Sequence, residues 1–170
     1  MTELPILLAE PHSLMRQTVA LTASSICRRP IFEASSLRMV RKMMIEQSFA
    51  AIIVPLCWDD DPSIYPTLEL IMAIRSAGTL CTPTVPVFIT AHTCSLDEAN
   101  MLADIDVKRV LIKPFKARLL IEALAELSLA SNSPISPESA MTRDRQFRTA
   151  LETREQSAQE RLQLRGARAA

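Results

Sequence analysis

Short apolar runs alternate with amphipathic stretches through the first 130 residues of the chain. The runs lie at residues 5–9, 30–34, 50–56, 85–90 and 107–112, and several are rich in Val and Ile with no polar interruption. Such runs are typical of strands in a parallel sheet whose two faces are both covered. Between them, the spacing of apolar residues predicts helices at residues 13–27, 36–47, 64–78, 95–103 and 116–130.

Five strand–helix units of this kind predict an α/β domain with a doubly wound, five-stranded parallel sheet of the flavodoxin-like type. Ser13 and Ser95 stand where helix N-caps are expected, and Glu98 follows Ser95 at the spacing of a capping box. In a sheet of this type the functional crevice lies at the carboxyl ends of the strands. The residues to inspect are therefore those that follow the strands, at 10–12, 55–58, 90–93 and 113–115.

The sequence after the predicted domain divides into two parts. Residues 131–138 (Ser-Asn-Ser-Pro-Ile-Ser-Pro-Glu) have the composition of a linker. Residues 139–170 predict a C-terminal helical extension with a narrow apolar seam, which Arg154 interrupts. The seam consists of Ala140, Phe147, Leu151, Ala158 and Leu162. A frayed, solvated tail is the alternative, because an isolated helix of this kind is only marginally stable in water.

Composition narrows the range of functions. The formal net charge is zero, although residues 139–170 carry seven Arg against four acidic residues. The only glycines are Gly78 and Gly166, so phosphate-binding loops of the GxGxxG or P-loop kind are excluded. No signal peptide or membrane-length apolar run is present, which predicts a cytoplasmic protein without a membrane partner. The four cysteines have no metal-ligand spacing, so we expect free thiols, no metal and no cofactor.

Three segments resemble the receiver domains of two-component response regulators. Ile-Leu-Leu-Ala-Glu-Pro-His-Ser (6–13) resembles the receiver opening, where two adjacent acids follow the first strand and hold a divalent metal. Val-Pro-Val-Phe-Ile-Thr-Ala (85–91) resembles the fourth strand, which ends in a switch hydroxyl. Val-Leu-Ile-Lys-Pro-Phe (110–115) resembles the fifth strand and its Lys-Pro dipeptide, which has a cis peptide bond in the family. The resemblance covers residues 4–128.

The resemblance also shows which receiver residues this chain lacks. Alignment of the strands places the phosphoacceptor position, an aspartate in the family, on Pro55, which has no nucleophile. The acidic pair is reduced to Glu10, and Val110 stands where the family has its switch aromatic. Thr90 and Lys113 are retained. The chain therefore resembles a degenerate pseudo-receiver in which the usual phosphotransfer has been lost.

Neighbouring residues offer alternatives at this crevice. The acidic triplet Asp59–Asp61 could bind a cation or supply an unorthodox phosphoacceptor such as Asp59, and a solvated loop is the simpler explanation. Cys57 could be a redox thiol or a packing residue beside Trp58. His12 and His92 could form a pH-sensitive or metal-binding pair. A Lys113–Glu10 ion pair would mimic a neutralised phosphorylation site permanently, unless Lys113 points to solvent.

We expect a non-enzymatic regulator that acts through protein contacts, with a sensor kinase or another regulator as its partner, or as a homodimer. A phosphorylatable single-domain response regulator is the alternative. An enzyme or a small-molecule site is a third possibility, but the sequence supplies no nucleophile–base pair for it. DNA binding is not expected, because no helix-turn-helix follows the linker. The resemblance implies an interface of helix 4, strand 5 and helix 5, extended by the tail. The predicted contact residues are Leu96, Met101, Lys108, Arg109, Arg118, Ile121, Phe147, Leu151 and Leu162.

Overall fold

A computed structural model describes residues 4–26, 29–116, 119, 120 and 122–125 of the chain. These residues form a five-stranded, all-parallel sheet in the order β2-β1-β3-β4-β5. The prediction of a doubly wound, flavodoxin-like sheet is thus confirmed. The expected linker and C-terminal helical extension lie outside the described residues.

Strands and helices alternate along the described chain. The elements are β1 (Ile6–Ala9), α1 (Ser13–Ile26), β2 (Ile31–Ala34), α2 (Leu37–Glu46), β3 (Ala51–Pro55), α3 (Tyr65–Arg75), β4 (Val87–Ala91), α4 (Leu96–Asp104) and β5 (Val107–Ile112). A last helical segment comprises residues 119, 120 and 122–125. No described helix is long and apolar enough to cross a membrane.

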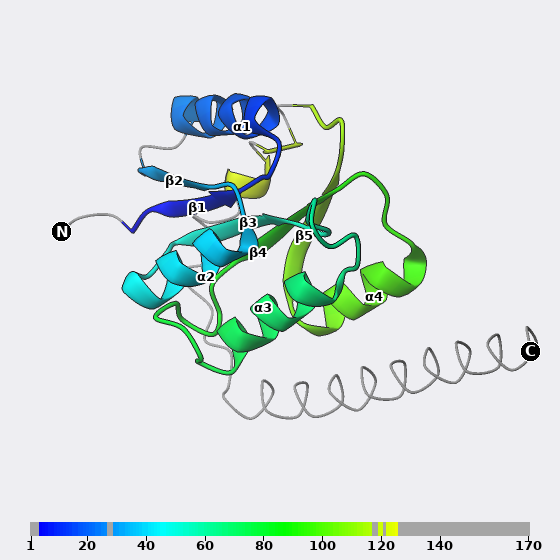
Figure 1. Ribbon diagram of the computed structural model, residues 1–170. Helices are drawn as coiled ribbons and strands as arrows, with labels where there is room; N and C mark the ends of the chain where they lie inside the picture. Colours follow the sequence, from blue (N-terminus) through cyan, green and yellow to red (C-terminus); the bar gives the residue numbers. More distant parts are fainter. Residues whose placement is uncertain (1–3, 27–28, 117–118, 121, 126–170) are drawn as a thin grey trace, which may run out of the picture.

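Helices cover the sheet on both faces (Figure 1). Alternate residues of each central strand face opposite sides, as the period of two in a strand requires. Leu7, Ile52 and Ile89 belong to a core with α2, α3 and α4. Ile53 and Phe88 belong to a second core with α1 and the last helical segment. Double coverage explains why the central strands β1, β3 and β4 are entirely buried.

Two edge strands depart from the expectation of full coverage. β2 and β5 close the sheet at its ends, and each exposes part of its length. Phe32 on β2 remains 37% exposed and packs edge-to-face on Phe49, with ring centroids 6.0 Å apart. Ile112 on β5 is 46% exposed.

Side-chain hydrogen bonds to free backbone N–H groups mark the first turns of α4 and α1. At α4, the Ser95 hydroxyl accepts a hydrogen bond from the Glu98 N–H at 3.3 Å, and the Glu98 carboxylate accepts one from the Ser95 N–H at 2.7 Å, so the predicted capping box is confirmed. At α1, Ser13 is already the first helical residue, so its expected place as N-cap is off by one. The preceding His12 accepts a long bond from the Met15 N–H at its Nδ1, at 3.4 Å.

Arg75 fastens the edge of the sheet opposite the candidate site. Its guanidinium donates to four backbone carbonyls, those of Pro83 at 2.7 Å, Val85 at 2.9 Å, Ile105 at 3.0 Å and Asp106 at 3.0 Å. Burial lowers the pKa of Arg75, which the charge of Asp106 partly offsets. The end of α3, the loop before β4 and the turn before β5 are thereby held by one side chain.

Candidate functional site at the carboxyl edge of the sheet

The sheet brings the residues retained at the crevice to one edge. Pro55, the last residue of β3, lies directly opposite Thr90 on β4. Just beyond β5, the backbone N–H of Lys113 donates to the Ala91 carbonyl at 2.7 Å, which extends the ladder by one bond. Glu10 follows β1, and its N–H donates to the Ala34 carbonyl at 3.0 Å. The peptide bond between Lys113 and Pro114 is cis, as the resemblance implied.

Lys113 and Glu10 form a buried ion pair. The Lys113 ammonium donates to Glu10 Oε2, and the two side chains are only 7% and 6% exposed. The other carboxylate oxygen, Oε1, accepts the His12 N–H at 3.1 Å. Lys113 therefore does not point to solvent, and the charge on each partner is balanced inside the protein rather than by water.

Arg16 holds the backbone of this loop from α1. Its Nη1 donates to the carbonyls of Glu10 at 2.7 Å and Pro11 at 3.2 Å. Its Nε pairs with Glu33 on β2 at 3.3 Å. The loop that carries Glu10 is thus fixed to both neighbouring elements, which positions the carboxylate for Lys113.

Pro55 is held by a chain of hydrogen bonds that the sequence did not reveal. The Thr67 hydroxyl donates to the Pro55 carbonyl at 2.9 Å and accepts a bond from the Trp58 indole N–H, also at 2.9 Å. Trp58 is only 4% exposed, and Thr67 is fully buried in α3. The Trp58 and Asp61 backbones pair with each other through two bonds of 3.1 Å. The loop after β3 is therefore anchored into the core instead of standing open above the sheet.

Thr90 is buried without an acceptor for its hydroxyl. The residue is 3% exposed, and its Oγ1 has no hydrogen-bond partner among the described residues. A buried hydroxyl without a partner costs about 1–3 kcal/mol. The predicted switch hydroxyl is present at the crevice, but nothing in the described part of the chain satisfies it.

The acidic triplet does not converge on the crevice. Asp59 and Asp60 are exposed. Asp61 accepts the Ser63 N–H at 2.9 Å, and this hydrogen bonding to Ser63 lowers the pKa of the Asp61 carboxyl. A solvated loop with one local turn bond accounts for the three acids.

Cys57 fits neither of its two interpretations well. It is exposed, so the packing interpretation is wrong, and the neighbouring Trp58 fills the core instead. Loss of solvation at the thiol raises the pKa of Cys57, and the charges of Glu98 and Asp61 add to the shift. A raised pKa leaves less thiolate at neutral pH, which is the opposite of what a reactive redox cysteine needs.

A metal ion does not fit the groups at this edge. Among the described residues, no three His, Cys, Asp or Glu side chains gather where they could hold one. Glu10 is the one acid that the described residues place at Lys113, and its carboxylate is paired with that ammonium. His12 and His92 are both exposed, and within the described part of the chain the one polar interaction of either ring is the bond that His12 accepts from the Met15 N–H. The magnesium that the family resemblance implies therefore lacks its ligands here.

The predicted interface residues are only partly described. Leu96 on α4 is 77% exposed, and Lys108 is exposed beside Asp106, with 2.9 Å between ammonium and carboxylate. Arg109 pairs with Glu122 at 3.7 Å. Two further residues, Met101 on α4 and Val110 at the altered switch position on β5, pack half-buried against the core. The remaining predicted contacts, Arg118, Ile121, Phe147, Leu151 and Leu162, lie outside the described residues.

Comparison with known proteins identifies the fold. No protein-family model and no curated protein sequence matches the chain. Solved structures do match it. A response regulator receiver domain protein (CheY-like) from Methanospirillum hungatei superimposes with a TM-score of 0.65 at 13% identity, over 76% of this chain and 97% of that one. The chemotaxis protein CheY4 of Vibrio cholerae gives a TM-score of 0.61 at 17% identity, over 74% and 98%.

A third match is a signal receiver domain of a histidine kinase from Clostridium thermocellum. It is 18% identical with a TM-score of 0.63, over 73% of this chain and 96% of that one. The described residues therefore have the fold of a receiver domain.

Proposed function

We propose that the chain is a pseudo-receiver, a non-enzymatic regulator in two-component-type signal transduction that works through protein contacts without being phosphorylated. The observation that carries the proposal is the closed Glu10–Lys113 pair beside Pro55. Phosphotransfer needs a carboxylate nucleophile, a cation between the two anions and a free ammonium to meet the incoming charge. At this edge proline replaces the nucleophile, and the ammonium already has a carboxylate.

The same pair supplies a reason for a fixed conformation. In a phosphorylatable receiver, the lysine and the threonine hydroxyl respond to a charge that comes and goes. Here Glu10 gives Lys113 a permanent counter-charge, and the Trp58–Thr67–Pro55 bonds hold the loop after β3. A protein with this arrangement keeps one conformation of its binding surface, because no phosphorylation changes the crevice. Its regulation then depends on which partner is present and in what amount.

A protein partner is proposed to bind the surface formed by α4 and β5. Leu96 is the most exposed large apolar side chain among the described residues, and Ile112 on the edge strand is 46% exposed. Lys108 stands on the same strand as Ile112 and adds a charged rim to the apolar centre. A sensor kinase, another regulator or a second copy of the chain would meet this surface.

Phosphodonor treatment tests the proposal. The full chain is incubated with acetyl phosphate and Mg²⁺, next to a phosphorylatable receiver as positive control, and both are read by intact mass. We expect the positive control to gain about 80 Da for one phosphoryl group while this chain gains nothing. A stoichiometric gain that disappears in Asp59→Asn would instead establish the phosphorylatable regulator with Asp59 as acceptor. A gain that survives Asp59→Asn would point to a different acid and would equally overturn the proposal.

A further inference from the structure

The outward side of α1 carries no charge. Its exposed residues are Ser13, Leu14, Gln17, Thr18, Leu21, Ser24 and Ser25. Leu14 and Leu21 are 67% and 73% exposed and stand two turns apart on one side of the helix. The one charged residue of α1, Arg16, turns to Glu10 and Glu33 instead. A helix face meant for water normally carries charged side chains, so this face has the character of a contact surface.

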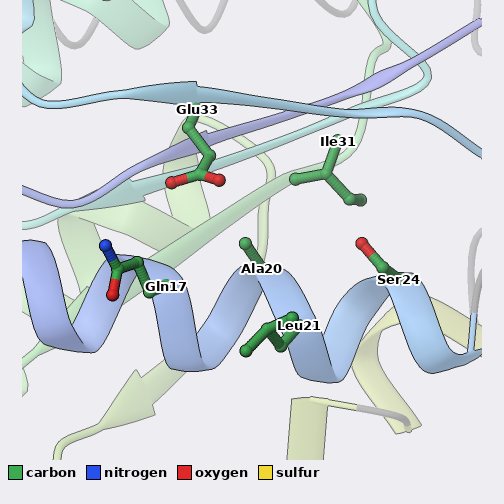
Figure 2. Close-up of a pocket in the computed structure, with 6 residues that line it drawn as sticks. All are labelled: Gln17, Ala20, Leu21, Ser24, Ile31 and Glu33. Carbon is green, nitrogen blue, oxygen red and sulfur yellow. The ribbon is translucent and has the colours of Figure 1, made fainter.

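A groove runs between this helix and the edge strand β2. Its volume is about 390 Å³, and it is lined by Gln17, Ala20, Leu21, Ser24, Ile31 and Glu33. Figure 2 shows Ile31 and Glu33 extending from the strand toward α1. Glu33 is the only charged residue among the described residues of the lining. Its side chain is 42% exposed although it pairs with Arg16, so its carboxylate can accept a second cation.

The described chain ends beside this helix. Leu120, Ala123 and Leu124 of the last helical segment share a core cluster with Val19 and Ala20 of α1. In Figure 1 this yellow segment lies on the same side of the sheet as α1. Whatever follows residue 125 therefore leaves the domain next to α1. The 13 residues from 126 to 138 can span up to about 40 Å when extended, several times the width of a helix.

The sequence of residues 139–170 is complementary to this surface. Its predicted seam is apolar except for Arg154, and the groove combines the apolar Ala20, Leu21 and Ile31 with polar side chains, of which Glu33 alone is charged among the described lining residues. From Phe147 to Leu162 a helix would be about 22 Å long, which is close to the length of the 14-residue α1 at about 21 Å. One cation in the seam and one anion in the groove define a register as well as a contact.

We propose that residues 139–170 dock as a helix on the α1–β2 surface of their own chain. Phe147, Leu151 and Leu162 cover Leu14 and Leu21, and Arg154 reaches Glu33. A short tether keeps the segment at an effective concentration of about millimolar, which favours its own chain over a second copy. The proposal goes beyond the proposed function, because it assigns an occupant to a surface on the far side of the sheet from α4.

Leucine methyl NMR of the full chain tests the docking. The variant Leu151→Asp puts a charge in the seam, and Leu164→Asp is the matched control, because Leu164 lies about 130° from the seam at 100° per residue. We expect Leu151→Asp to shift the methyl resonances of Leu14 and Leu21 and Leu164→Asp to leave them in place. The difference should not depend on protein concentration.

Each other outcome would overturn the proposal. Concentration-dependent shifts at Leu14 and Leu21 would make a second copy the occupant. Shifts at Leu96 alone would place the segment on α4. No shift in either variant would mean that nothing from residues 139–170 covers α1. The converse variant Leu21→Asp changes α1 instead of the tail, so it distinguishes docking from an effect confined to residues 139–170. Leu21 is 73% exposed, so the domain tolerates the charge. We expect this variant to shift the Leu162 methyl resonances. None of these results bears on the phosphodonor experiment.

Discussion

Removing the carboxylate charge of Glu10 should destabilise the fold severely. Glu10→Gln keeps the size of the side chain and an oxygen for the His12 N–H, but it leaves the Lys113 ammonium without a counter-charge. Because the Lys113 side chain is only 7% exposed, water cannot take over that role. Breaking a buried ion pair from one side costs about 3–5 kcal/mol. Domains of this size are stable by about 5–15 kcal/mol, so the variant would lose a large share of its free energy of unfolding.

Urea unfolding measures this loss. The transition is followed by the fluorescence of the single tryptophan, Trp58, and by far-UV circular dichroism. With a slope of about 2 kcal/mol per molar urea, the midpoint should fall by about 1.5–2.5 M at unchanged slope. Glu33→Gln is the matched control, because it breaks the Arg16 pair at a side chain that is 42% exposed. That change should cost no more than about 1 kcal/mol.

The double variant Glu10→Met, Lys113→Met separates pairing from general damage. Replacing a buried pair by apolar side chains of similar size is often neutral or stabilising, so the double variant should be much more stable than Glu10→Gln. A loss of less than about 1 kcal/mol in Glu10→Gln would refute the reasoning, because it would mean that the ammonium reaches water. The proposal of a permanently neutralised crevice would fail with it.

Three further changes probe other parts of the molecule. Thr90→Val should raise the free energy of unfolding by about 1 kcal/mol, since it removes a buried hydroxyl without a partner; a loss in urea unfolding would show that the hydroxyl is bonded. Arg75→Ala should cost about 3 kcal/mol in the same assay, because four backbone carbonyls lose a charged donor; an unchanged midpoint would contradict this. Cys57 should react slowly with iodoacetamide at neutral pH because its pKa is raised, and Glu98→Gln, which keeps the capping box, should speed the reaction when followed by peptide mass mapping. Equal rates in the two proteins would refute the influence of Glu98.

The sheet could be predicted from the sequence because its central strands are marked by composition. Runs such as residues 50–56 contain β3 (Ala51–Pro55) almost to the residue, since a strand buried on both faces is apolar along nearly its whole length. Strand ends were then enough to place Glu10, Thr90 and Lys113 at one edge. The Glu10–Lys113 pair was a hypothesis with a solvent-exposed Lys113 as its alternative, and the structure shows the pair.

Contacts made across long distances in the sequence could not be predicted in the same way. The chain from Trp58 through Thr67 to Pro55 depends on how α3 sits on the sheet, and an indole beside a cysteine gives no sign of it. In the sequence, Arg75 looks like an ordinary basic residue at the end of a helix. In the structure, two of its backbone acceptors are 30 and 31 residues away along the chain. The groove at β2 depends on which strand lies at the edge, which apolar runs do not reveal.

The fluorescence of the anchored Trp58 indole reports on the conformation of the loop after β3. Trp58 is the only tryptophan in the chain, and it sits three residues beyond Pro55 with its N–H bonded to the hydroxyl of Thr67. Indole emission responds to hydration and to hydrogen bonding at this N–H, so any event that loosens the loop after β3 will register as a spectral change. Partner binding, ion-pair rupture or an unexpected modification at the crevice can therefore be followed in the unlabelled protein. A binding partner without tryptophan could be titrated directly against that signal.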